Sequence, residues 1–449
     1  MENYFALQDS ATDVRKEVVG GITTFLTMAY IIAVNANILG AEGVGMPPGA
    51  IVTATCLTAG LTTIFMGLYA KLPFALAPGM GLNAFFAFSV VLGMGISWHV
   101  ALTAVFVEGI IFILLSLTNV REMVVNAIPT NLKYAVTAGI GLFISFIGFI
   151  NAGIVIKSDA TTVAMGNLIS PTVLIAVVGV LIIVILSKKN VKGAILWGIL
   201  ISSIVAWGYA IISPESALSY GISLPERIFK YESLKPIAFK LDFSFFNSKA
   251  QIMQFITIVF TFLFVDFFDT VGTLVGVASK VGMVDEDGKV KNAGKALLVD
   301  AIGTTVGSIL GTSTVTTYVE SSAGVAAGAR TGLASVVTGI LFLIALFFSP
   351  IFIAIPSAAT APALIIVGFY MIDSIKNIDF SDFTEGVPAF LTLALMPLTY
   401  SIGDGLTIGV LAYASMNFIS NIVSKEKKKI SPVMYILAIV FLIKIIASH

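Results

Sequence analysis

Long apolar stretches follow one another from about residue 20 to the end of the chain, separated by short polar segments. A helix needs about 20 apolar residues to cross the roughly 30 Å hydrocarbon layer of a membrane. The pattern therefore predicts an all-α integral membrane protein with about fourteen transmembrane spans, the last of which divide ambiguously. The candidate segments are residues 20–41, 50–70, 82–96, 98–118, 133–151, 169–187, 193–213, 252–279, 293–311, 320–329, 331–349, 358–373, 386–401, 403–423 and 432–447.

The composition agrees with a membrane protein. Of the 449 residues, 57% are hydrophobic and 11% are charged, whereas a soluble domain carries about 25% charged residues. The chain has one cysteine, Cys56, and two histidines, His99 and His449, too few for a thiol or histidine metal site. A formal net charge of zero gives no reason to expect a nucleic acid as partner. We expect no catalytic centre, no metal and no cofactor, and hence not an enzyme.

Lysine and arginine residues gather in alternate loops, for example at 188–192 and 425–429. By the positive-inside rule these loops and the N-terminus, residues 1–19, lie in the cytoplasm. The first apolar stretch has the full length of a span, so no cleavable signal is expected. The sequence predicts a multi-pass protein of the cytoplasmic membrane, surrounded by lipid, with a long outer loop at residues 214–250.

Two sequence matches at one spacing indicate an internal repeat. The tripeptide Thr-Phe-Leu at 24–26 recurs at 261–263, and Asn83 in one broken apolar segment corresponds to Glu320 in another, both at an offset of 237. Two halves with seven spans each must lie inverted relative to one another, as in many secondary transporters. The sequence therefore predicts two inverted seven-span repeats.

The two broken segments are LPFALAPGMGLNAFFAF at 72–88 and LGTSTVTTYVESSAGVAAGA at 310–329. Proline and glycine exclude a continuous helix from the first, and β-branched residues favour extended backbone in the second. We expect spans 3 and 10 each to contain a short β-strand and a half-helix that begins near Leu82 or Glu320. Such backbone needs hydrogen-bond partners inside a membrane, which pairing of the two strands would supply. The facing helix N-termini would hold a polar, flat or anionic ligand; the alternative is a pair of kinks that serve only packing.

Three acids, Asp266, Asp269 and Glu320, lie in apolar surroundings. A charged side chain costs roughly 2.5 to 3.5 kcal/mol at the centre of a bilayer. No lysine or arginine lies in the same spans, so protonation or a ligand with N–H donors must compensate. Asp266 and Asp269 share one helix face and can couple, which leaves one of them protonated near neutral pH. We interpret the acids as a proton-linked binding site; the alternative is that serine, threonine or backbone donors satisfy them.

Other polar and aromatic residues carry less weight. Glu108 and Asp300 are expected to form structural hydrogen bonds to neighbouring spans. Phenylalanines near the acids are more often packing residues, although Phe268 would suit stacking on a planar base.

The segments PGMGLNAFFAF, FVDFFDTVGTLVG and STVTTYVESSAGVAAGARTG closely resemble motifs of the nucleobase-cation symporter-2 superfamily, in its branch of AzgA-like adenine, guanine and hypoxanthine permeases. The resemblance implies proton-coupled transport, substrate between the strands of spans 3 and 10, and dimers through a gate domain. It also implies a core domain of spans 1–4 and 8–11 that moves against a gate domain of spans 5–7 and 12–14. The corresponding ranges are 20–128 and 251–350 for the core, and 129–213 and 351–449 for the gate.

The resemblance also assigns roles to particular residues. Asp269 matches the acid of span 8 that contacts the base, Glu320 the acid of span 10, Asn83 an asparagine of span 3, and Asp266 an accessory acid. The proton would then reside on Asp269, Asp266 or Glu320.

Backbone N–H groups near Ala84 and Ser321, and a Phe268 ring, would complete the substrate site. The resulting hypothesis is proton symport of guanine, hypoxanthine or adenine.

One position departs from the pattern of the uracil-type relatives, which carry a histidine where this chain has Thr273. That change disfavours, without excluding, a uracil or xanthine symporter of the same fold. An anion transporter of the sulfate-carrier type would have to tolerate Glu320 at its site. An aspartyl intramembrane protease would need its two acids on separate helices, whereas Asp266 and Asp269 share one.

Overall fold

The computed structural model describes residues 2–5, 7–8, 10–117, 129–245, 248–279, 292–423 and 427–448. Within these ranges nine helices are long and apolar enough to cross a membrane, and five shorter apolar helices accompany them. The predicted all-α membrane fold is confirmed, with its short strands in spans 3 and 10.

The helices and strands divide into two halves of seven elements. The first half contains α2 (Val14–Met28) with α3 (Tyr30–Leu39), α4 (Pro48–Phe65), β1 (Leu76–Pro78) with α5 (Met80–Ala84) and its π-helical continuation η2 (Phe85–Gly93), α6 (Trp98–Ser116), α8 (Thr130–Ala152), α9 (Pro171–Lys188) and α10 (Ala194–Ile212). The second half contains α12 (Lys249–Ser279), α13 (Ala293–Leu310), β4 (Val315–Thr317) with α14 (Ser321–Ala326), α15 (Gly332–Ala345), α17 (Ser357–Ile372), α18 (Phe383–Leu398) and α19 (Ile402–Val423).

A further apolar helix, α20 (Pro432–Ser448), follows the second half. It accounts for the ambiguous division of the C-terminal segments. The hairpin of β2 (Val155–Ser158) and β3 (Thr162–Met165) between α8 and α9 was not predicted. The remaining short elements are α1 (Glu2–Phe5), η1 (Met66–Ala70), α11 (Pro214–Ser219), α16 (Ser349–Ile353) and η3 (Asp373–Asn377).

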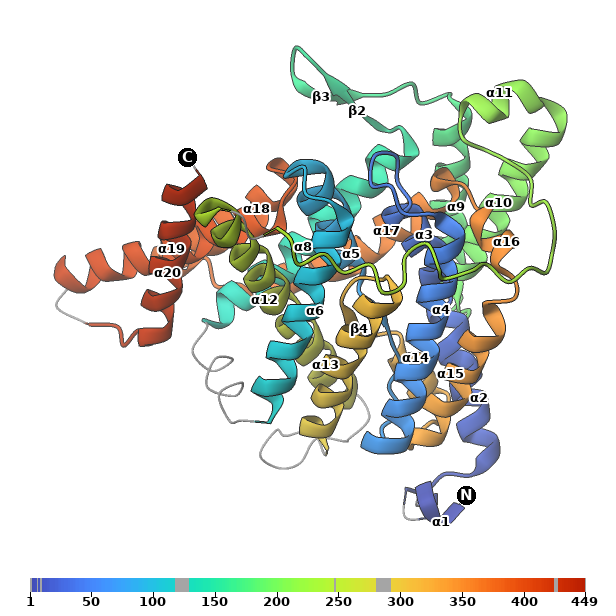
Figure 1. The fold of residues 1–449 in the computed structure, drawn as a ribbon, viewed down its shortest axis with the longest axis horizontal. Helices are drawn as coiled ribbons and strands as arrows, with labels where there is room; N and C mark the ends of the chain where they lie inside the picture. Colours follow the sequence, from blue (N-terminus) through green and yellow to red (C-terminus); the bar gives the residue numbers. More distant parts are fainter. Residues whose placement is uncertain are drawn as a thin grey trace.

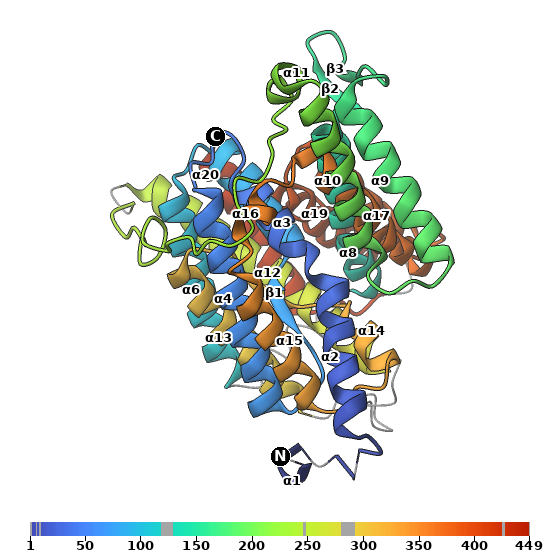
Figure 2. The same cartoon turned by 90° about the vertical axis from the view of Figure 1, so that its right-hand side faces the viewer.

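The spans pack as two groups (Figures 1 and 2). One group contains α2, α4, α6, α12, α13 and α15, and the other contains α8, α9, α10, α17, α18 and α19. Each group combines helices from both halves of the chain. Strands β1 and β4 lie with the first group, between α4 and α13.

Glycine allows α4 and its continuation η1 to approach α15 at backbone distance. A Cβ atom at Gly332 would lie 2.0 Å from the carbonyl oxygen of Gly67, and one at Gly339 would lie 2.6 Å from that of Gly60. Small residues at helix contacts are a general solution for packing inside membranes, where van der Waals contact replaces the hydrophobic effect. The contact joins the second and eleventh spans, one from each half.

We expect Gly332→Ala to lower stability by about 1 to 3 kcal/mol, because an added methyl group overpacks the contact with Gly67. Thermal unfolding of the purified protein in detergent measures the change. Gly208→Ala is the matched control, since a Cβ atom there meets no atom within 4 Å. Equal unfolding temperatures for the two variants would show that α15 shifts at little cost.

Candidate functional site

The two predicted strands pair with each other, and we call the place where they meet the strand crossing. β1 and β4 are antiparallel, with Ala77 opposite Thr316, and every residue in both strands is buried. The Gly79 N–H donates to the Thr314 carbonyl oxygen at 3.0 Å, and the Tyr318 hydroxyl donates to the Pro78 carbonyl oxygen at 2.5 Å. The half-helices begin at Met80 and Ser321, close to the predicted starts.

Two threonines bond the outer edges of this strand pair. The Thr63 hydroxyl on α4 accepts from the Leu76 N–H at 2.9 Å and donates to the carbonyl oxygen of the same residue at 3.0 Å. The Thr304 hydroxyl on α13 does the same for Val315, with both distances 3.1 Å. A side-chain hydroxyl thus occupies the position that a further strand would fill in a larger sheet.

The pairing is consistent with the internal repeat. The register places Pro78 opposite Val315, 237 positions further along the chain (315 − 78), which is the offset of the sequence matches. A two-fold axis through this pair relates Asn83 to Glu320. The local symmetry relates the backbones of the two half-helices and leaves their polar side chains unmatched.

Glu320 lies between β4 and α14, and its side chain is bonded by the first span. The Tyr30 hydroxyl donates to Oε1 of Glu320 at 2.5 Å, and the Thr27 hydroxyl donates to the Glu320 carbonyl oxygen at 3.4 Å. Tyr30 is fully buried, whereas Glu320 is partly exposed and its neighbour Val319 is 51% exposed. A carboxylate that accepts from Tyr30 on one oxygen, in a residue that is partly exposed, suits recognition of N–H groups. The sequence did not indicate Tyr30, which begins α3 just after the break in the first span.

The other residues predicted on the two half-helices are enclosed. Asn83 is fully buried, its Oδ1 accepts from the Ser313 hydroxyl, and its Nδ2 has no hydrogen-bond partner in the part of the chain that the structure describes. Ala84 is buried beside it. The Ser321 N–H donates to the Tyr318 carbonyl oxygen at 3.1 Å, and the Ser321 hydroxyl accepts from the backbone N–H of residue 75 at 2.9 Å. In this conformation Ser321 stabilises the strand crossing.

The acids of the eighth span are described in part. The side chains of Phe268 and Asp269 lie outside the described residues. Asp266 is fully buried, and the Thr270 hydroxyl lies 3.2 Å from its Oδ1 and 3.2 Å from each carboxyl oxygen of Asp300 on α13. The structure thus links Asp266 with Asp300, which the sequence suggested only as a structural residue.

Glu108 on α6 belongs to the same region. It is fully buried, and its Oε2 accepts from the Thr314 hydroxyl at 2.8 Å. Glu108 also interacts with Asp266 and Asp300. Among the described residues, no group of three histidine, cysteine or acidic side chains is arranged to hold a metal ion.

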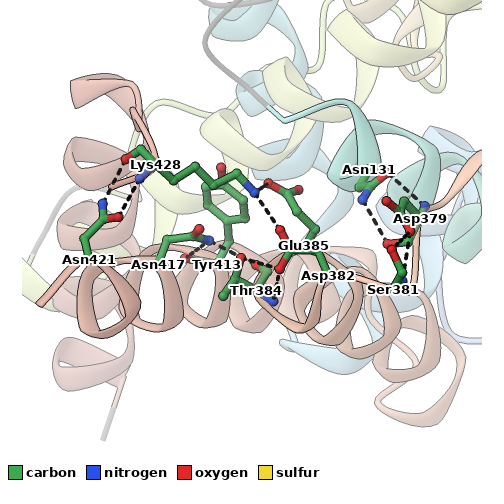
Figure 3. Close-up of polar contacts among 10 residues, drawn as sticks. All are labelled: Asn131, Asp379, Ser381, Asp382, Thr384, Glu385, Tyr413, Asn417, Asn421 and Lys428. Carbon is green, nitrogen blue, oxygen red and sulfur yellow. Dashed lines mark hydrogen bonds and ion pairs between the residues drawn. The ribbon is translucent and has the colours of Figure 1, made fainter. Parts of the chain in front are cut away.

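A separate ion-pair cluster lies at the start of α18 (Figure 3). The Lys428 ammonium lies 2.5 Å from Glu385 and 3.1 Å from Asp382, and its backbone N–H donates to Asn421 at 2.8 Å. Hydrogen bonds from Thr384 are the main reason why the pKa of Asp382 lies below its usual value. Burial acts to lower the pKa of Lys428, but the two carboxylates outweigh it and raise that pKa. The cluster ties the α19–α20 loop to α18.

Comparison with known proteins covers almost the whole chain. The family model Xan_ur_permease, described as the Permease family, matches residues 15–408. The guanine/hypoxanthine permease PbuG of Bacillus subtilis is 45% identical over 451 residues, which cover 99% of each chain. The adenine permease AdeP of Escherichia coli is 40% identical over 446 residues, which cover 99% of this chain and 96% of AdeP.

Solved structures share the fold at low sequence identity. The transmembrane domain of the cyanobacterial bicarbonate transporter BicA has a TM-score of 0.64 at 16% identity and covers 88% of this chain and 97% of its own. SLC26A9 has a TM-score of 0.62 at 12% identity, with coverage of 91% and 66%. These similarities concern the arrangement of the spans.

We expect Thr304→Val to lower the free energy of unfolding by about 2 kcal/mol or more, because it leaves the buried N–H and carbonyl groups of Val315 without their hydroxyl partner. Thr304→Ser keeps the hydroxyl and is the control. Thermal unfolding in detergent compares the two variants with the wild type. If valine proved as stable as serine, the strand edge would not depend on this side chain.

Proposed function

The chain belongs to the Permease family, and on this premise we propose that it takes up purine nucleobases, namely guanine, hypoxanthine or adenine, by proton-coupled alternating access. It is a multi-pass membrane protein and a transporter rather than an enzyme. Its relatives PbuG and AdeP are named guanine/hypoxanthine and adenine permeases. The observation that carries the proposal is the partly exposed residue Glu320, whose carboxylate accepts a hydrogen bond from Tyr30 beside the strand crossing.

The chemistry of Glu320 suits a purine. An O–H···O distance of 2.5 Å is typical of a hydroxyl that donates to an ionised carboxylate. An ionised Glu320 would accept the ring N–H of a purine, together with the exocyclic amine in guanine. Asp269, protonated, would donate to a carbonyl or ring nitrogen of the base. Buried polar groups that a wrong ligand leaves unpaired give such sites their specificity.

Proton coupling follows from the same chemistry. If Asp269 must be protonated in order to donate to the base, then proton and purine stabilise each other's binding. Linkage requires the effect to be reciprocal, so that purine affinity depends on pH in the same sense as proton affinity depends on purine. Because Thr273 replaces the histidine of the uracil-type relatives, the proton must be held by an acid, with Asp269, Asp266 and Glu320 as candidates.

The two packing groups of helices provide the moving parts. In the proposed cycle the core domain, residues 20–128 and 251–350, shifts against the gate domain, residues 129–213 and 351–449. The protein would lie in the lipid of the cytoplasmic membrane with its N-terminus in the cytoplasm. Two copies would form a homodimer through the gate domain. Anion transport, the activity named for the structural neighbours, fits less well because the carboxylate of the partly exposed Glu320 would repel an anion.

We expect Glu320→Gln to weaken purine binding at least tenfold, since a charged hydrogen bond contributes about 1.5 to 3 kcal/mol. Calorimetric titration of the purified protein with guanine, hypoxanthine, adenine, uracil and sulfate between pH 5 and 8 measures affinity and pH dependence together. Glu385→Gln, in the Lys428 cluster, is the matched control. Binding of uracil or sulfate alone, or undiminished purine binding by Glu320→Gln, would contradict the proposal.

Tyr30→Phe should weaken the binding of the preferred purine about tenfold, because Glu320 loses the donor that orients its carboxylate. The fold should be preserved, since only an oxygen atom is removed. Tyr413→Phe, another buried tyrosine on α19, should bind normally. The same calorimetric titration measures the purine affinity of Tyr30→Phe. An affinity equal to that of the wild type would mean that the Tyr30 hydroxyl does not contribute to binding.

A further inference from the structure

Three buried carboxyl groups from three different helices form a connected set beside the strand crossing. Glu108 on α6, Asp266 on α12 and Asp300 on α13 each have no exposed surface. An ionised carboxylate inside a membrane costs roughly 2.5 to 3.5 kcal/mol on insertion scales. Three such charges close together would also repel one another, which favours at least one bound proton.

Close helix packing brings Glu108 to the two aspartates. A Cβ atom at Gly109 would lie 2.4 Å from the hydroxyl oxygen of Thr305, so α6 and α13 approach closely. One turn further along α6, the centroid of the Phe112 ring lies 6.1 Å from that of Phe267, the residue next to Asp266. The titratable groups that face Glu108 among the described residues are Asp266 and Asp300.

One hydroxyl group joins the two aspartates of this set. The Thr270 hydroxyl has one hydrogen and lies 3.2 Å from oxygens of both aspartates. It can donate to one carboxylate while it accepts from the other only if the second carries a proton. Oε1 of Glu108 accepts no hydrogen bond from any described residue. Two carboxyl groups can hydrogen-bond to each other directly only if at least one of them is protonated, and their titrations are then coupled.

One short segment connects these acids with the strand crossing. Ser313 donates to Asn83 on the first half-helix, and the next residue, Thr314, donates to Oε2 of Glu108. The Thr314 carbonyl oxygen accepts from the Gly79 N–H at 3.0 Å, at the end of β1. A movement of this segment would therefore change the donor to Glu108 at the same time as it changes the surroundings of the half-helices.

We propose that Glu108 holds the transported proton together with Asp266 and, through Thr270, with Asp300, so that α6 contributes a proton-binding residue that does not contact the substrate. The proton resides between Oε1 of Glu108 and the Asp266 carboxyl group and can pass to Asp300 by way of the Thr270 hydroxyl. Thr314 couples its release to the strand crossing. The inference rests on the proposed function, since it specifies where the symported proton is bound.

The test separates the movement of purine from the movement of protons. Glu108→Gln keeps the shape of the side chain and an acceptor for Thr314 but has no exchangeable carboxyl proton. In liposomes, exchange of labelled for unlabelled hypoxanthine at equal pH requires no net proton transfer, whereas accumulation driven by an inward proton gradient does. For Glu108→Gln we expect exchange within threefold of the wild type and accumulation reduced at least tenfold. Glu385→Gln should resemble the wild type in both assays.

A conservative variant distinguishes proton binding from a role in folding. Glu108→Asp keeps a titratable group and should restore at least part of the accumulation. Gradient-driven accumulation by Glu108→Gln at the wild-type level would overturn the inference while purine symport stands. Loss of exchange in both variants would also overturn it, because Glu108 would then support the fold of the site. If the wild type accumulates no purine under any proton gradient, the proposed function fails, and the proton assignment fails with it.

Discussion

The structure depends on one constraint: backbone N–H and carbonyl groups inside a membrane must find hydrogen-bond partners within the protein. Spans 3 and 10 are not helical at β1 and β4, so the backbone N–H and carbonyl groups there have no partners within their own span. The pairing of β1 with β4 satisfies the inner edges, and Thr63 and Thr304 satisfy the outer ones. This solution requires α4 and α13 to lie on opposite sides of the crossing. The positions of both half-helices, and hence of Glu320, follow from it.

The symmetry of this arrangement is limited to the backbone. Each half supplies a strand, a half-helix and a threonine on a neighbouring span, related by an axis through the paired strands. The side chains break the symmetry: Glu320 is partly exposed and bonded to Tyr30, whereas Asn83 is enclosed and bonded to Ser313. An asymmetric ligand such as a purine needs different partners at its two edges. The repeated backbone sets the position of the binding site, and the different side chains of the two halves supply its hydrogen-bonding groups.

Much of the architecture could be predicted from local signals. Proline and glycine before Asn83 and β-branched residues before Glu320 indicated the strands, because these residue types restrict the backbone wherever they occur. The contact between Tyr30 and Glu320 could not be predicted, since 290 positions separate the two residues and no local motif marks Tyr30. Glu108 and Asp300 were expected to be structural for a similar reason. Only the packing of three helices shows that they meet Asp266.

The crossing of the strands has a consequence for how the chain is made. Thr316 is synthesised 239 residues after Ala77, which at about 5 to 20 residues per second takes roughly 12 to 50 seconds. During that interval the backbone of β1 has no partner strand, although the helices that precede it can already be inserted. The nascent first half must therefore hold β1 in water, in the insertion machinery or against Thr63 until the second half arrives. During biogenesis of this transporter, β1 therefore pairs with β4 only after most of the chain has been synthesised.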